Sequence, residues 1–195
     1  MTDLELFDLY KNSSIEGLSS ALGEACISGN LSEIKFLLTS PLLSIHANIH
    51  HYSENALFHA CDNEHLDVIH YLLTSPELNE HADIHADDAI CFTLACEYNR
   101  INVIKYLLTT PELKDKIDIH AYDDKAFNIA ITESHDELLR FFIFDMKIEK
   151  TLMINLLLDT HKESKANHFF ELRELNDNLN IDLIPSSTIK GKIKL

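Results

Sequence analysis

The stretch that decides the fold is residues 56–90, ALFHACDNEHLDVIHYLLTSPELNEHADIHADDAI, because its pattern recurs along the chain at a fixed step of 35 residues. The recurring positions are a small residue, a leucine pair, a proline and an Ile-His pair: Ala21, Ala56, Cys91 and Ala126; Leu37-Leu38, Leu72-Leu73 and Leu107-Leu108; Pro41, Pro76 and Pro111; Ile49-His50, Ile84-His85 and Ile119-His120. A fixed period of about 20–50 residues is typical of a stacked repeat array.

Within one copy, the spacing of apolar residues predicts two short helices. Small and apolar side chains at 56–63 fall on one helical face, and those at 66–73 form a second stripe. The segment between them leaves room only for a tight turn. Helices of about two turns are not stable alone in water, so each must bury its stripe on its partner and on the neighbouring copy.

The segment after the second helix predicts two further features. Ser75 followed by Pro76 predicts one extra helical turn, since serine is a good N-cap and proline is tolerated at the first helical position. Residues 81–88 are polar and prone to turns, which predicts an extended, hairpin-like loop before the next helix.

This pattern resembles the ankyrin repeat, a pair of antiparallel helices with a projecting β-turn. The resemblance rests on NALFHA at 55–60, where ankyrin repeats prefer a Thr-Pro-Leu-His-x-Ala box, on the second-helix leucines, and on ADIH at 82–85, where the family has Ala-Asp-Val-Asn. It covers roughly residues 19–145. It implies an all-α ankyrin-repeat solenoid of helix-turn-helix units, with short β-turn or hairpin loops and helical caps at both ends.

The chain departs from the family pattern at defined positions. The period is 35 residues and the proline of the box is missing. The glycine between the helices survives only as Gly29; the other copies have Glu64, Asn99 and Ser134. Glutamate is mildly strained in the left-handed conformation of that turn. A tetratricopeptide array, of about 34 residues per repeat, is the alternative; the long loop in each copy favours ankyrin.

The repeat step divides the chain into segments. We expect a capping helix that begins near Thr2, with Ser19 and Ser20 capping the next helix. The expected segments are an N-terminal capping helix at 1–20, repeats at 21–55, 56–90 and 91–125, a degenerate fourth repeat at 126–147, a C-terminal helical-hairpin cap at 148–178 and a tail at 179–195.

The formal net charge of −16 limits the classes of partner. Nucleic acids and anionic lipids are bound through Lys and Arg, so a chain this acidic should repel both and attract a basic protein surface. Simple solubility is the alternative explanation. No apolar run approaches the ~20 residues of a membrane span, and residues 1–20 lack a secretory signal pattern. We therefore expect a cytoplasmic protein.

The cysteines and histidines predict neither a disulfide nor a metal site. Cys26, Cys61 and Cys96 share one repeat position, so they should lie about 8–10 Å apart, and a disulfide needs Cα atoms within about 7 Å. His50, His85 and His120 also lie one repeat apart, too far to share a zinc ion with ~2 Å bonds. We expect each histidine to tie its loop to the next, with no metal or cofactor.

Catalysis is not expected. A nucleophile needs a neighbouring base and an orienting group, but Cys61 and Cys96 fall on the buried, repeating face, and Cys91 occupies an alanine position. The sequence has no phosphate-binding glycine-rich loop, no Cys-x-x-Cys and no Glu-x-x-His on a predicted helix. We therefore predict no catalytic residues.

The positions that differ between copies are the hairpin tips and the ends of the first helices. By resemblance, these positions line the concave face on which ankyrin arrays bind partners, and tyrosine is enriched at interfaces. Ordinary variation of solvated tips is the alternative. The predicted partner-binding residues are Tyr52, Glu54, Asp62, Asn63, Asp87, Asp88, Glu97, Tyr98, Tyr122, Asp123 and Asp124.

We expect the chain to bind another protein without catalysis, and to be a monomer rather than an oligomer. The composition also resembles ankyrin proteins of bacteria that live in eukaryotic hosts, which are often secreted effectors; no secretion signal is visible. Two alternatives stay open: an enzyme with its site in 148–195, and a structural protein that self-associates through Phe141, Phe142 and Phe144.

Overall fold

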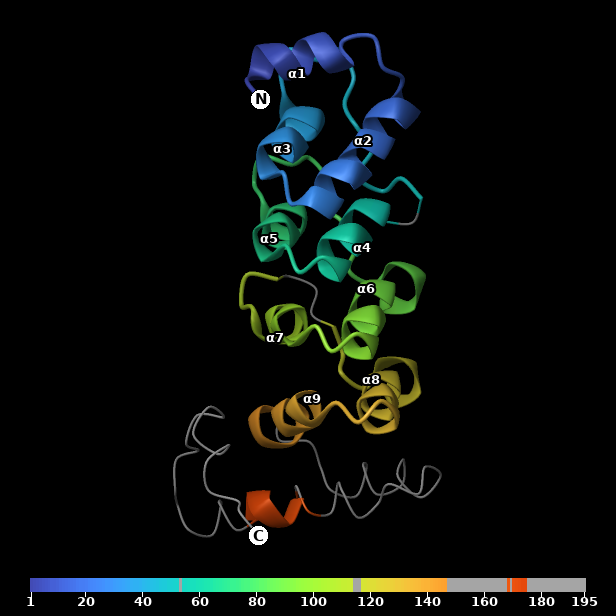
Figure 1. The fold of residues 1–195 in the computed structure, drawn as a ribbon, viewed down its shortest axis with the longest axis vertical. Helices are drawn as coiled ribbons and strands as arrows, with labels where there is room; N and C mark the ends of the chain where they lie inside the picture. Colours follow the sequence, from blue (N-terminus) through green and yellow to red (C-terminus); the bar gives the residue numbers. More distant parts are fainter. Residues whose placement is uncertain (53, 114–116, 147–167, 169, 175–195) are drawn as a thin grey trace. The chain divides into compact units, whose positions relative to one another are not determined.

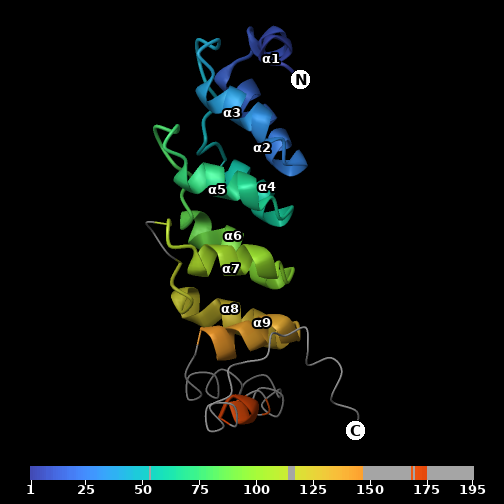
Figure 2. The same ribbon diagram turned by 90° about the vertical axis from the view of Figure 1, so that its left-hand side faces the viewer.

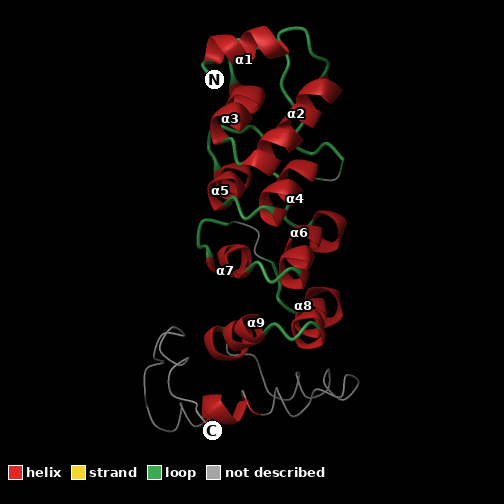
Figure 3. Cartoon of the chain, in the orientation of Figure 1, coloured by secondary structure: helices red, strands yellow, loops and turns green. Residues whose placement is uncertain are grey.

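The computed structural model describes residues 1–52, 54–113, 117–146, 168 and 170–174, and for residues 121–123 it describes the backbone alone. The chain forms two compact units, Met1–Ala126 and Phe127–Leu195, called here the N-terminal and C-terminal units. Helices make up the regular structure of the described residues, which contain no strand (Figure 3).

The N-terminal unit is a stack of helix pairs, preceded by a single helix. Its helices are α1 (Asp3–Tyr10), α2 (Ile15–Ser28), α3 (Leu31–Thr39), α4 (Asn55–Asp62), α5 (Leu66–Thr74), α6 (Ala86–Glu97) and α7 (Ile101–Thr109). The first helices α2, α4 and α6 lie in one column and the second helices α3, α5 and α7 in another (Figure 1). This arrangement is the predicted all-α repeat solenoid.

The apolar stripes explain why the pairs stack. Helix α4 buries Ala56, Leu57, Ala60 and Cys61, and it packs on α2, α5 and α6. Helix α5 buries its own stripe, of which Leu72 is wholly inaccessible to solvent. Burying one leucine side chain contributes about 1.5–3 kcal/mol, so packing supplies the stability that these short helices lack alone.

The N-terminal cap forms as expected, but the start of the next helix does not. Thr2 caps α1 in a capping box with Glu5. Helix α2, however, begins at Ile15 with Ser14 as its N-cap, so the prediction that Ser19 and Ser20 cap it was wrong. The Ser19 hydroxyl is buried inside the helix, where it accepts a 2.9 Å hydrogen bond from the Asn48 amide of the following loop.

The turn between the two helices of each pair uses the left-handed region. Its residue has φ of 68° at Gly29, 59° at Glu64, 54° at Asn99 and 59° at Ser134. Because Glu64 has a Cβ atom, its left-handed backbone is strained, as the sequence predicted.

The link after each second helix is a single turn and not the extra helical turn that Ser75-Pro76 suggested. The Leu78 amide donates to the Ser75 carbonyl at 3.2 Å, and Leu43 donates to Ser40 at the same distance. The Ser75 hydroxyl accepts from the Glu77 amide at 3.3 Å. A helix does not start because the chain then turns back, and the Ala82 amide bonds to the Leu72 carbonyl at 3.0 Å.

The loops that follow differ from hairpins. They project from the same side of the helix stack after α3 and after α5 (Figure 2). Each contains an Asx turn in which Asn48, Asp83 or Asp118 accepts from the amide two residues later. Within α6, residues Asp87 to Ala89 have φ between 48° and 58°, so a left-handed turn joins loop and helix.

Buried phenylalanine rings pack together in the described part of the C-terminal unit. Helix α8 (Ala121–Thr132) ends in it, and α9 (Asp136–Arg140) continues into the π-helix η1 (Phe141–Asp145). The rings of Phe127 and Phe142 lie 4.7 Å apart between centroids, and Arg173 donates a 3.1 Å hydrogen bond to the Ile143 carbonyl. Most of the predicted cap at 148–178 and the tail at 179–195 lie outside the described residues.

Candidate partner-binding surface

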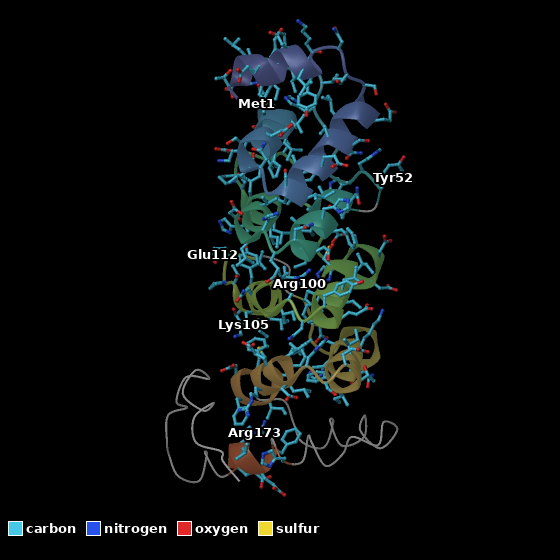
Figure 4. The ribbon with its side chains drawn as sticks, in the orientation of Figure 1. Met1, Tyr52, Arg100, Lys105, Glu112 and Arg173 are labelled. Atoms are coloured by element: carbon cyan, nitrogen blue, oxygen red, sulfur yellow. The ribbon has the colours of Figure 1, made fainter. Side chains whose placement is uncertain are left out.

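Two of the three predicted interface tyrosines have described side chains, and both are exposed. Tyr52 is 79% exposed and Tyr98 is 56% exposed. Tyr52 projects outward from the loop before α4, as Figure 4 shows. Tyr98 directly follows the last residue of α6, where it serves as the C-cap. Large aromatic side chains left in solvent by an otherwise closed core are candidates for contact with a partner.

Acidic and polar side chains share these positions. Asp87 and Asp88 are exposed at the left-handed turn that starts α6. Glu97 is exposed at the end of α6, and Asn63 at the end of α4. Asp62 is half-buried, and its carboxylate lies 3.9 Å from the Arg100 guanidinium. These side chains lie at two ends of the first helices: Tyr52, Asp87 and Asp88 are at the N-terminal ends of α4 and α6, and Asn63, Glu97 and Tyr98 are at the C-terminal ends.

Glu54 does not belong to this surface. Its side chain is only 3% exposed, because the left-handed backbone at this position turns the carboxylate inward to pair with the His50 ring. Burial raises the pKa of the Glu54 carboxyl, and the contact with His50 opposes that shift. The hydrogen bond to Glu54 in turn raises the pKa of His50, and burial opposes it.

The third loop tip is described in part. Asp124 is half-buried and bonds the His120 ring at 2.7 Å, the same four-residue pairing as His50 with Glu54. Tyr122 and Asp123 have no described side chains. Their membership of the surface therefore stays a prediction.

His50 makes the predicted contact between one loop and the next, whereas His46 and His81 bond within their own loops. The His50 ring lies 3.4 Å from the Glu80 carboxylate of the following loop. His46 and His81 each donate a 2.9 Å hydrogen bond to a serine carbonyl at the start of their own loop. The described residues contain no cluster of three or more His, Cys, Asp or Glu side chains that could hold a metal ion.

A link between consecutive repeats that was not predicted from the sequence lies at the N-caps of α5 and α7. His65 donates a 3.0 Å hydrogen bond to the Ile27 carbonyl of the preceding repeat. Arg100, 35 residues later, forms a 3.0 Å ion pair with Glu64 of its own preceding repeat. The residues at this repeat position are Asn30, His65, Arg100 and His135, so no constant residue type marked the contact in the sequence.

A second missed link runs along the second helices. The Lys35 ammonium lies 5.2 Å from the centre of the Tyr71 ring in the next repeat, within the range of a cation–π interaction. One repeat on, the His70 ring bonds the Tyr106 hydroxyl at 2.9 Å. In both cases a basic side chain contacts an aromatic ring 36 residues later.

All four cysteines are buried, free thiols. Burial raises the pKa of Cys26 and of Cys96 to about 12. A hydrogen bond with Cys91, followed by burial, raises the pKa of the Cys61 thiol. The thiolate is the nucleophilic form, so the raised pKa values disfavour it at Cys26, Cys61 and Cys96.

Comparisons with known proteins bear on the repeat pattern. Residues 4–88 match a family model described as ankyrin repeats in three copies. No curated protein and no solved structure matches the chain. Within the described residues, no helix has the length and hydropathy needed to cross a bilayer. The matched segment holds α1 to α5, so residues 4–88 carry ankyrin repeats, and α6 with α7 repeats the same helix pair.

Proposed function

We propose that this array binds a partner protein, without catalysis, through the surface formed by Tyr52, Asp87, Asp88, Tyr98 and the neighbouring helix ends. Ankyrin repeats are generally protein–protein interaction modules. The observation that carries the assignment is the exposure of the Tyr52 and Tyr98 rings at positions that differ from repeat to repeat. The core does not need these rings, and tyrosine contributes a large contact area at low entropic cost.

The charge of the array suggests the class of partner. Residues 1–100 contain 16 Asp and Glu side chains but three Lys and Arg, a formal charge of −13. A surface of one sign steers oppositely charged proteins toward it and is screened by salt. The proposed partner therefore presents Lys and Arg around an apolar or aromatic anchor, and its capture should weaken as the salt concentration rises.

Self-association is not favoured. Phe141 and Phe142 are buried and Phe144 is half-buried, so the three rings do not form the uncovered aromatic patch on which that alternative depended. We infer that the chain acts as a monomer. Analytical ultracentrifugation of the full chain tests this, and a dimer at micromolar concentration would contradict it.

The test of the surface compares partner capture by matched variants. Tyr52→Ala with Tyr98→Ala removes both exposed rings, and Leu4→Ala with Leu9→Ala removes two equally exposed apolar side chains from α1. The tyrosine pair should reduce the recovery of captured proteins, measured by quantitative mass spectrometry, whereas the leucine pair should not. Equal recovery with all three baits would contradict the proposed surface.

A further inference from the structure

Two cavities lie one repeat apart in the N-terminal unit. The first, of about 480 Å³, lies between the α1–α2 connection and the loop after α3. Its lining residues are Phe7, Tyr10, Lys11, Asn12, Ser13, Leu18, Leu42, Leu43, Ser44 and Ile45. The second, of about 290 Å³, lies between the loops after α3 and after α5. Its lining residues are Leu38, His46, Ala47, Asn48, Ile49, Leu78, Asn79 and Glu80.

The two cavities are equivalent in the repeat. One wall is 43–45 in the first cavity and 78–80 in the second, a shift of 35 residues. The opposite wall is 11–13 in the first and 46–48 in the second, again a shift of 35 residues. The chain therefore forms the same groove at successive steps, but lines it with different side chains.

The first groove is lined by both polar and apolar atoms, and the apolar part of its rim can contact a ligand side chain. Leu42 is 45% exposed and Ile45 is 40% exposed at its rim, and Phe7 and Leu18 also line it. Two of its polar side chains are already bonded: the Tyr10 hydroxyl donates to Glu33 at 2.6 Å, and Lys11 pairs with Asp8 at 2.8 Å. A leucine-sized side chain placed here would cover apolar surface without breaking either interaction.

The second groove is suited to a basic side chain. Its lining carries the Glu80 carboxylate, whose side chain is 75% exposed. The His50 ring lies 3.4 Å from that carboxylate but leaves it open to solvent. The other ionisable side chain of the lining, His46, already donates to the Ser40 carbonyl at 2.9 Å. A lysine or arginine side chain placed here could pair with the Glu80 carboxylate.

The distance between neighbouring repeats matches the distance between side chains on one extended ligand. Helices packed in neighbouring repeats lie about 8–10 Å apart. An extended segment in the polyproline II conformation has three residues per turn and advances about 3.1 Å per residue, so side chains three residues apart lie on one face and are separated by about one repeat.

We propose that these two grooves together bind an extended, basic protein segment, with an apolar side chain in the first groove and a lysine or arginine three residues away in the second. Its lining residues differ from those of the Tyr52 and Tyr98 surface, but the second groove is lined by the same loop that carries Tyr52. The formal charge of −13 over residues 1–100 favours a basic occupant over an acidic or neutral one.

Labelled peptides test the spacing directly. The probes are three fluorescein-labelled peptides of identical composition in a Gly/Ser/Lys background: leucine three residues before arginine, leucine three residues after arginine, and the two adjacent. At least one spaced peptide should bind the full chain about tenfold more tightly than the adjacent peptide, measured by fluorescence anisotropy. Equal affinity of all three, or binding of none, would overturn the proposal.

Variants assign the binding to the grooves. Ile45→Asp and Glu80→Lys should each weaken the better spaced peptide about tenfold, and a peptide with glutamate in place of arginine should bind Glu80→Lys more tightly than wild type. Leu9→Asp, an exposed apolar position outside both grooves, is the control. Both Ile45 and Glu80 are exposed, so folding should survive, and circular dichroism verifies it. Unchanged peptide binding in both groove variants would show that the peptide does not bind in these grooves.

The outcome can be separated from the Tyr52 surface. If the tyrosine variant loses the peptide and the groove variants keep it, the groove assignment fails while the proposed function stands. If the groove variants lose the peptide and the tyrosine variant keeps it, the groove assignment is supported whatever the other surface binds.

Discussion

At the residue scale, the array depends on single side chains that fit one backbone geometry. Gly29 shows this most clearly, because its φ is +68° and an added Cβ would lie 2.6 Å from the His65 ring. The sequence predicted a glycine turn here and predicted the strain at Glu64. It did not predict that the His65 ring fills the space above Gly29, since that contact depends on how two repeats pack.

Gly29→Ala should destabilise the chain strongly. The left-handed backbone costs about 1–2 kcal/mol for a residue with a Cβ, and the new methyl group displaces the His65 ring from its hydrogen bond to Ile27. Gly17→Ala is the matched control, because its Cβ would meet nothing closer than 3.6 Å. Urea unfolding measures both, and the account fails if the two variants unfold at the same midpoint.

The pairing of His50 with Glu54 predicts a dependence of stability on pH. The pKa of His50 is raised in the folded state, so its protonation stabilises the fold below about pH 6.5, and this contribution is lost as pH rises through the folded pKa. The pKa of Glu54 is also raised, so ionising this carboxyl costs stability as pH rises above its unfolded value of about 4.5. The two groups therefore act in separate pH ranges.

His50→Ala should remove the part of the stability that is lost as pH rises above about 6.5. His85→Ala is the control, since His85 occupies the same repeat position but has Ala89 in place of the acid. Denaturant unfolding at several pH values gives the comparison. A wild-type profile that matches that of His50→Ala over this range would rule out the proposed linkage.

At the element scale, the helices whose positions are set by buried apolar stripes were predicted correctly, and the helix ends that are set by local hydrogen bonds were not. The apolar stripes predicted α4 and α5 almost to the residue. The start of α2 at Ile15 was missed because Ser14 and Ser19 are equally good caps in sequence, and only packing shows Ser19 to be interior. The π-helix η1 had no recognisable signal, because its phenylalanines suit an α-helix as well.

The docking of α1 offers a prediction for one element. The Tyr10 hydroxyl donates a 2.6 Å hydrogen bond to Glu33 of α3, and burial, followed by that bond, raises the pKa of Tyr10 far above its ordinary value. Tyr10→Phe should lower the free energy of unfolding by about 1–3 kcal/mol, because Glu33 loses a donor.

Tyr52→Phe is the control for this change, since the Tyr52 hydroxyl is in solvent. Thermal unfolding followed by circular dichroism compares the variants, and hydrogen exchange of the α1 amides reports local opening. A Tyr10→Phe protein as stable as Tyr52→Phe, with α1 amides equally protected, would show that this hydrogen bond does not hold the cap.

At the scale of the whole molecule, the 35-residue step predicted the stack of helix pairs, and the structure adds the interactions that connect the pairs. The candidate surface was predicted less completely. Tyr52 and Tyr98 are exposed as expected, because a position that varies between repeats has no place in the repeated core. Glu54 is buried because a left-handed turn reverses its side chain, and a pattern of residue types does not encode that reversal.

The most direct test of the central claim, that the positions differing between repeats contact a protein partner, is hydrogen–deuterium exchange of the full chain with and without a partner captured by the tyrosine-dependent experiment. We predict new protection at the loop before α4, at the left-handed turn of Asp87 and Asp88, and at the C-terminal ends of α4 and α6. Protection confined to the second helices α3, α5 and α7, with these segments unchanged, would contradict the account.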